Sequence, residues 1–331
     1  MTNRFKNTVK ILCLCLMLLL PVVTHAAPTG EIIFRHPEDY RELWIGNVND
    51  GRSAQPLFKM PHDIRAFSIQ RDGRYIIAVV WKKGKDEFDS FHDIYLLDRE
   101  NPNVAPKRLT QGQYREIIDA AISPDKDVIF TNHSWGLRPG VYLIPNHEIE
   151  KKNPNAKLLQ QLNAYEVDWA PNGKKIAYST DFGIFLLDTA TKETSQIIKH
   201  NDFDDFPVFS PNSKQLAFLA KTKPFELGKL GIVSVVGPRN LRYIELEEGI
   251  FNFVDHLTWS VDGKYLVYTM FSDWDPAYTN FAVHIDSGVT ERVLETYSNG
   301  GLRLFEWATR AYALEPEGLL TTVWGEIKQR K

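Results

Sequence analysis

The chain has 331 residues, of which 39 are Lys or Arg and 42 are Asp or Glu, so its formal net charge is −3. This balance offers no basic surface for a phosphate backbone, and we expect no nucleic-acid partner. Both cysteines, Cys13 and Cys15, lie near the amino terminus, so the rest of the chain must fold around a packed core without disulfides.

The first 26 residues have the three parts of a signal peptide. Arg4, Lys6 and Lys10 precede an apolar run over residues 11–23, and the segment ends in the small residue Ala26. The run is too short to cross a bilayer, which takes about 20 residues. We predict a cleaved signal peptide over residues 1–26, a periplasmic or secreted mature chain and no membrane span after cleavage. A retained anchor is the alternative.

A repeated hairpin pattern runs through the remaining residues, 27–331. In each copy, two apolar runs flank a turn that contains Asp, Asn or Glu beside Pro or Gly, as in VDWAPNGKKIAYS at 167–179. Pro fixes one φ, Gly or Asn supplies a positive φ, and the Asp or Asn side chain bonds to nearby backbone. The turn residues are Asp72, Asp125, Asn172, Asn212, Asp262 and Glu317, at separations of 53, 47, 40, 50 and 55 residues.

Each hairpin is followed by two more apolar runs of strand length. Third strands are expected at 93–98, 141–145, 183–188, 230–236 and 280–286, and fourth strands at 106–110, 156–160, 194–199, 241–246 and 291–295. Four strands in a period of this length are typical of a β-propeller blade. The sequence therefore predicts an all-β, six-bladed propeller with four-stranded blades.

The sixth blade is expected to close the ring with both ends of the chain. Segment 31–59 contains later strands but no hairpin turn before them, and segment 304–327 contains a first strand and the turn residue Glu317. Closure in this way removes exposed sheet edges. Either 31–35 or 319–327 could supply the second strand of this closing blade.

The segment DIYLLDRENPNVAPKRLT at 93–110, together with the Ser-Pro-Asp/Asn-Gly turns, resembles the TolB-type six-bladed propeller repeat. The resemblance implies a bacterial envelope protein that binds partners. TolB has an α/β domain before its propeller, whereas blade material begins here at Glu31, so we expect that domain to be lacking. Similar repeats form the propeller of prolyl oligopeptidase-like enzymes, but no Gly-x-Ser-x-Gly nucleophile motif occurs in this sequence.

Polar residues recur six and seven positions before the turn residues, close to the start of each first strand. The usual blade topology brings these positions to one mouth of the central channel. The candidates are Arg65, Asp119, Tyr165, Glu166, Asp205, Asp255, His256 and Arg310. Solvated polar residues at a channel mouth are the plainer interpretation of this pattern.

Long aromatic connections between second and third strands lie on the same face, for example 81–92 and 271–280. Loops on a rigid scaffold often bind partners, and Trp, Tyr, Phe and Arg often anchor interfaces. The loop candidates are Trp135, Arg138, Phe225, Trp274 and Tyr278. The two Trp side chains could instead fold over their own blades.

Nothing in the sequence has the spacing of a metal or cofactor site. The His residues lack ligand spacing, and the acidic cluster Asp202, Asp204 and Asp205 lacks the Gly-centred calcium loop with its closing Glu. We expect no metal and no cofactor.

The favoured interpretation is an exported, monomeric binding protein, rather than an enzyme, that holds a protein, peptide or glycan at the channel mouth. A hydrolase or lyase acting on a carbohydrate or ester, with Asp205, Asp255 or His256 in the reaction, is the alternative. A purely structural envelope protein is the third possibility.

Overall fold

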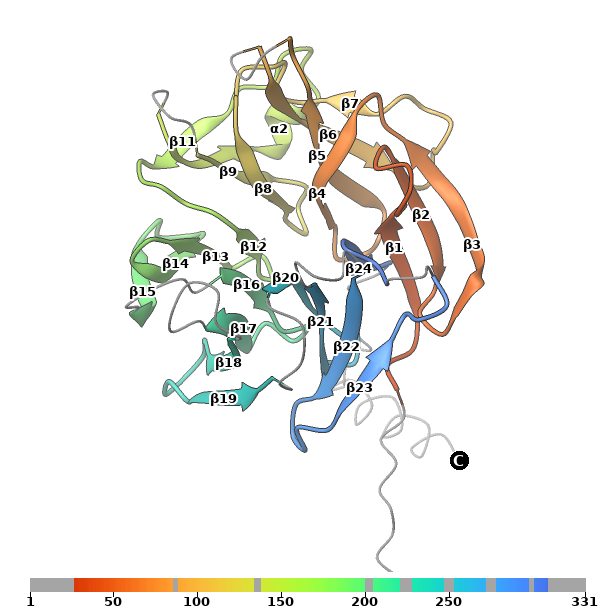
Figure 1. The fold of residues 1–331 in the computed structure, drawn as a ribbon. Coiled ribbons are helices and arrows are strands. Elements are labelled where there is room, and N and C mark those ends of the chain that lie inside the picture. Colours follow the sequence, from red (N-terminus) through yellow and green to blue (C-terminus); the bar gives the residue numbers. More distant parts are fainter. Residues whose placement is uncertain are drawn as a thin grey trace, which may run out of the picture.

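The computed structural model describes residues 27–85, 89–133, 138–199, 205–220, 228–246, 253–271, 278–297 and 301–308. Within these ranges the strands form six four-stranded antiparallel sheets, arranged as blades around a central axis (Figure 1). The predicted all-β, six-bladed propeller is thus confirmed. No helix in these ranges has the length and apolar character needed to traverse a bilayer.

The blades are numbered from the one that closes the ring, and their strands are given from the axis outward. Blade 1 consists of β24 (Phe305–Trp307), β1 (Glu31–Arg35), β2 (Glu42–Asn47) and β3 (Asp50–Lys59). Blade 2 consists of β4 (Asp63–Ile69), β5 (Tyr75–Lys82), β6 (Phe91–Asp98) and β7 (Lys107–Arg108). Blade 3 consists of β8 (Ile117–Ile122), β9 (Val128–Asn132), β10 (Gly140–Ile144) and β11 (Lys157–Gln160), with the helical turn α2 (Asn146–Ile149) before β11.

The other three blades keep the same order. Blade 4 consists of β12 (Val167–Trp169), β13 (Lys175–Thr180), β14 (Gly183–Asp188) and β15 (Thr194–Lys199). Blade 5 consists of β16 (Asp205–Phe209), β17 (Gln215–Ala220), β18 (Lys229–Ser234) and β19 (Leu241–Glu245). Blade 6 consists of β20 (Phe253–Trp259), β21 (Tyr265–Phe271), β22 (Thr279–His284) and β23 (Thr290–Val293). Every expected third and fourth strand of blades 2–6 is present within a few residues of its predicted bounds.

The repeated turns form through the side chains that the sequence pattern singles out. The Asp72 and Asn172 side chains each accept a hydrogen bond from the backbone N–H two residues later, at 2.9 Å. The positive φ lies at the residue after the turn residue, which is Gly173 in blade 4 but Lys126 and Ser213 in blades 3 and 5. The expectation that Asn itself takes this conformation is therefore wrong in blade 5, where Ser213 takes it.

The hydrophobic core lies between the blades rather than at the axis. Six buried apolar clusters each join two neighbouring blades, and together they run around the whole ring. Apolar side chains of one sheet thus pack against those of the next, as in stacked sheets. The axis is left to side chains of the innermost strands.

Blade 1 is closed by hydrogen bonding between the two ends of the described chain. Strand β24 pairs antiparallel with β1, with Trp307 opposite Ile32 and Phe305 opposite Phe34. Residues 31–35 therefore supply the second strand, which settles the alternative left open by the sequence. Glu317, the expected turn residue of this blade, lies outside the described residues; the first strand β24 ends at Trp307, and its partner β1 comes from the other end of the chain.

Ring closure should depend strongly on Phe305, whose side chain is fully buried between blades 1 and 6. Replacing Phe305 by Ala should lower the free energy of unfolding by about 3–5 kcal/mol, because it leaves a cavity in a dry cluster. Phe182, which is 73% exposed, offers a matched control in which the same change should cost less than about 0.5 kcal/mol. Chemical denaturation of both variants measures the difference, and equal effects would contradict this account of closure.

Candidate functional site

Equivalent positions of the six innermost strands form a polar ring at one mouth of the channel. Four residues before the last residue of these strands stand Arg65, Ile118, Tyr165, Asp205, Asp255 and Arg303. Three residues before it stand Ala66, Asp119, Glu166, Phe206, His256 and Leu304. The sequence pattern thus identified the correct ring positions in blades 2–6. In blade 1 the equivalent position of the described first strand belongs to Arg303, whereas the prediction of Arg310 was counted back from Glu317, and both of those residues lie outside the described ones.

A cavity of about 280 Å³ occupies this mouth, and five of the predicted residues line it. These are Arg65, Asp119, Glu166, Asp255 and His256. Three charged lining residues were missed by the sequence reasoning, namely Asp168, Arg303 and Glu306. Asp168 and Glu306 each stand directly before the Trp that ends their strand. Side chains alternate between the two faces of a strand, so this position points the same way as the position two residues earlier, and that alternation could have revealed both residues.

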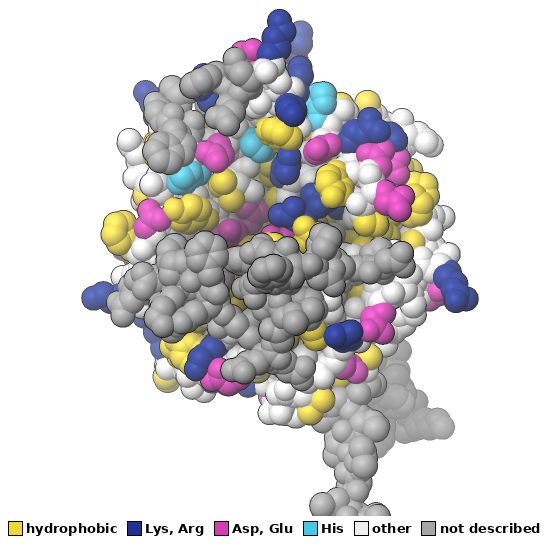
Figure 2. Space-filling view, in the orientation of Figure 1, with side chains coloured by type: hydrophobic (Ala, Val, Ile, Leu, Met, Phe, Trp, Pro, Cys, Tyr) yellow, Lys and Arg dark blue, Asp and Glu magenta, His cyan; other side chains and the backbone are white. Residues whose placement is uncertain are grey.

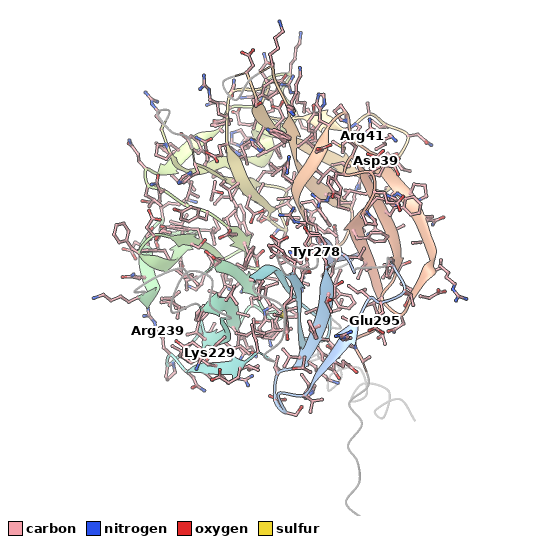
Figure 3. All side chains as sticks on the ribbon, in the orientation of Figure 1. Asp39, Arg41, Lys229, Arg239, Tyr278 and Glu295 are labelled. Atoms are coloured by element: carbon pink, nitrogen blue, oxygen red, sulfur yellow. The ribbon has the colours of Figure 1, made fainter. Side chains whose placement is uncertain are left out.

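The other predicted residues have different surroundings. Tyr165 stacks on His133 with ring centroids 5.2 Å apart, and its hydroxyl donates a 2.6 Å hydrogen bond to Asp181. Tyr278 lies near the axis in Figure 3, with the Arg303 guanidinium 5.8 Å from its ring centre.

Arg138 lines a separate pocket of about 360 Å³ beside blade 3. Trp135, Phe225, Trp274 and Arg310 lie outside the described residues.

One side of the mouth is acidic. We call Asp119, Glu166, Asp168 and Asp205, on blades 3 to 5, the acidic wall; the first three line the cavity, whereas the predicted residue Asp205 does not line it but acts on Glu166 as a neighbouring charge. Asp119 Oδ2 accepts a 3.0 Å hydrogen bond from the Val167 backbone N–H of the next blade. Glu166 Oε2 accepts one of 2.7 Å from the Ser179 hydroxyl. Within the part of the chain that the structure describes, no Lys, Arg or His forms an ion pair with Asp119 or Glu166.

Burial of these carboxylates changes their acidity. The pKa of the Asp119 carboxyl is raised to about 7, mainly by burial and also by the nearby charge of Glu166, against the lowering effect of the hydrogen bond from the Val167 N–H. Burial likewise raises the pKa of Glu166 to about 7, with Asp205 as the main neighbouring charge and the Ser179 hydrogen bond opposing. Both groups therefore change charge near neutral pH.

The opposite side of the mouth is basic. We call Arg35, Arg65 and Arg303, on blades 1 and 2, the arginine cluster. Arg303 donates hydrogen bonds of 2.5 and 3.2 Å to the two carboxylate oxygens of Asp255. The Arg65 guanidinium lies over the Trp81 ring, 4.3 Å from its centre. In a ring of six blades, blade 1 stands opposite blade 4 and blade 2 opposite blade 5, so the arginine cluster faces the acidic wall across the axis. Figure 2 shows acidic and basic side chains close together near the centre of this face.

His256 is held by the backbone of the closing blade. Its Nε2 lies 2.6 Å from the Phe305 carbonyl oxygen, which can only accept, so Nε2 carries the hydrogen of this bond. Glu306, 3.9 Å from the same nitrogen, accepts a hydrogen bond from the Thr258 hydroxyl. His256 thus anchors blade 6 to blade 1, and its Nε2 is not available to take a proton from a substrate.

Among the described residues, no group of three or more His, Asp or Glu side chains has the arrangement of a metal site.

Comparison with solved structures identifies the fold. The chain superposes on TolB from Acinetobacter baumannii with a TM-score of 0.65 at 17% identity, covering 85% of this chain and 67% of that one. It matches a TolB candidate from Agrobacterium tumefaciens with a TM-score of 0.56 at 17% identity, covering 87% and 94% of the two chains. It also matches the periplasmic gluconolactonase of Pseudomonas aeruginosa with a TM-score of 0.53 at 16% identity, covering 80% and 82%.

No protein-family model matches the sequence, and no curated protein matches it. The chain has a TolB-like six-bladed propeller fold, which confirms the resemblance drawn from its repeats. At this level of identity the likeness defines the fold and leaves the function to the site.

The raised pKa values predict how the acidic wall affects stability. A carboxyl whose pKa is higher in the folded than in the unfolded chain stabilises the fold at low pH, and that contribution is lost as the pH rises from about 4 to about 7. The variants Asp119→Asn and Glu166→Gln keep their hydrogen-bond acceptors but cannot ionise. Each should gain about 1–2 kcal/mol of unfolding free energy relative to the unaltered chain between pH 4.5 and pH 8.

Urea denaturation at four pH values across this range measures that gain. A difference between variant and unaltered chain that stays constant with pH would show that these carboxyls are ordinary surface acids.

Proposed function

We propose that the mature chain is an exported, non-enzymatic binding module whose channel mouth holds a cationic group of a protein or peptide partner against the acidic wall. The observation that carries this proposal is that Asp119 and Glu166 line the cavity with no ion-pair partner among the described residues. Half-buried carboxylates without a cation are costly to keep charged, as the raised pKa values of Asp119 and Glu166 indicate. A Lys or Arg side chain, or an amino terminus, would relieve that cost.

Export rests on the signal peptide predicted over residues 1–26, and the TolB-like fold is compatible with a place in the periplasm or outside the cell. The mature chain would meet its partner as a monomer. Its rigid blades, held together by six interblade clusters, present the mouth as a preformed cavity. A preformed cavity loses little conformational freedom on binding, which favours the recognition of short, flexible segments.

Hydrolysis of an ester, lactone or carbohydrate is the second candidate function. It is supported by the two carboxyls whose pKa values are raised to about 7, which suits general acid–base catalysis at neutral pH. The fold is shared with a gluconolactonase, although at 16% identity. The engagement of His256 Nε2 by the Phe305 carbonyl leaves Nδ1 as the nitrogen of this ring that could take part in such a reaction.

The double variant Asp119→Asn, Glu166→Gln should bind a Lys- or Arg-containing partner at least about tenfold more weakly, because it loses charge-assisted hydrogen bonds. Affinity capture from envelope extracts supplies candidate partners, and calorimetry with a captured peptide measures the change. Glu193→Gln, an exposed change on the same blade as Glu166, is the matched control and should bind like the unaltered chain.

Acetylation of the extract's Lys side chains and amino termini should reduce capture, since it removes their charge. Equal binding by the double variant and the control would contradict the proposal. Capture that persists after protease treatment of the extract would indicate a glycan. Turnover of a lactone, ester or oligosaccharide panel that is lost in Glu166→Gln would establish the enzyme.

Affinity for a cationic peptide should also rise with pH. The bound cation favours the ionised carboxyls, so below pH 7 binding must first displace protons from Asp119 and Glu166. Calorimetry at pH 5.5 and pH 8 should show roughly thirtyfold tighter binding at the higher pH for each carboxyl that must lose a proton. Binding that is independent of pH would place the peptide elsewhere.

A further inference from the structure

The arginine cluster contains a buried charge without a carboxylate partner. Arg35 is only 5% exposed, and its guanidinium makes one hydrogen bond, of 2.9 Å, to the Ile64 backbone carbonyl. It lies over the Tyr40 ring, 4.3 Å from the ring centre. No Asp or Glu among the described residues forms an ion pair with Arg35 or with Arg65.

This arrangement is unfavourable for the chain alone. A buried cation is normally paired with an anion, because removal from water without a partner costs several kcal/mol. Burial lowers the pKa of Arg35 to about 10, and the positive charges of Arg303 and Arg65 contribute to the lowering. The three guanidinium groups thus repel one another, and Asp255 compensates only Arg303.

Backbone contacts place Arg35 directly beside the cavity. Its N–H donates to the carbonyl of Leu304 at 3.1 Å, and its side chain bonds the carbonyl of Ile64. Leu304 follows Arg303 and Ile64 precedes Arg65, and both of those arginines line the cavity. Arg35 therefore contacts Leu304 and Ile64, the chain neighbours of the two arginines that line the cavity, and lies next to both arginines without lining the cavity itself.

We propose that the arginine cluster is a carboxylate subsite, in which Arg65 and Arg303 contact a carboxylate of the ligand and Arg35 adds positive charge behind them. The planar guanidinium matches the two oxygens of a carboxylate, and Arg303 already binds the Asp255 carboxylate with two nitrogens. The mouth also contains Asp119, Glu166 and Asp168, whose negative charge favours a monoanion over a dianion such as sulfate or phosphate.

The subsite also deepens the proposed function and, in that part, rests on it. With the acidic wall opposite the arginine cluster, the mouth fits a peptide segment that carries both a cationic group and a carboxylate. A peptide end is such a segment when a Lys or Arg lies near the carboxyl terminus. The opposed walls would fix the direction in which this segment enters the mouth.

A small carboxylate that carries no cationic group tests the subsite without involving the acidic wall. N-acetylglycine has a carboxylate and no cation, and N-acetylglycinamide is its uncharged match. Titration of the mature chain at constant ionic strength, followed through the arginine Nε–Hε nuclear magnetic resonance signals, should show binding of the acid and none of the amide. Sulfate should bind more weakly than the acid.

Variants of the arginines test whether the probe binds at this subsite. Arg65→Gln, at an exposed side chain, should weaken N-acetylglycine binding by about tenfold, the loss expected for one charge-assisted hydrogen bond. Arg239→Gln removes the same charge at the outer side of blade 5 and should leave binding unchanged (Figure 3). Arg303→Gln should also weaken binding, and Arg35→Lys should weaken it less than either, because it keeps the charge.

The subsite would be overturned by no binding of N-acetylglycine to the unaltered chain, or by equal binding by Arg65→Gln and Arg239→Gln. Tighter binding of sulfate than of N-acetylglycine would also overturn it, because that result would show a site for dianions. Asp119→Asn should bind the probe at least as well as the unaltered chain, because it removes a negative charge. Failure of the acidic wall to hold cationic peptides would therefore leave this result intact, and the two proposals fail separately.

Discussion

The channel-facing edge of the innermost strands is the constraint on which the rest of the mouth depends. A four-stranded blade leaves one edge of its first strand at the axis, with backbone groups that the sheet itself cannot satisfy. Here side chains of the preceding blade supply partners: Asp119 accepts from the Val167 N–H, and Asp168 accepts from the Phe209 N–H at 2.7 Å. Polar side chains therefore have a structural reason to lie at the axis that is independent of any ligand.

The polarity of the mouth arises because the repeated backbone positions have diverged in sequence. The two ring positions together hold an Arg in each of blades 1 and 2 and a carboxylate in each of blades 3 to 6, so a symmetric scaffold presents an asymmetric charge. Blade 2 has Ser68 where blade 4 has Asp168 and blade 1 has Glu306, so an uncharged residue fits this position. Closing the ring therefore does not require a charged residue at this position, and charged residues beyond structural need are typical of functional sites.

The sequence predicted the scaffold because hairpin chemistry repeats in it, and it failed where that chemistry is absent. In blades 2–6 a turn fixes the register of each first strand, so counting back from Asp262 reaches Asp255 and His256 correctly. In blade 1 the first and second strands come from opposite ends of the chain and are joined by hydrogen bonds alone. No turn marks their register, and the count from Glu317 consequently led to Arg310 instead of Arg303.

Arg35 illustrates a second limit of prediction from the sequence, because its burial depends on tertiary contacts rather than on the local sequence. It ends a second strand, and nothing in its neighbourhood along the chain distinguishes it from a surface arginine. Its burial results from a contact across blades, to the carbonyl of Ile64, and from the closure that brings Leu304 beside it. The residue that concentrates positive charge at the mouth is thus placed there by the same pairing of chain ends that seals the ring. A change that loosened the pairing of β24 with β1 would therefore disturb the arginine cluster before the acidic wall, which is built within blades 3 to 5.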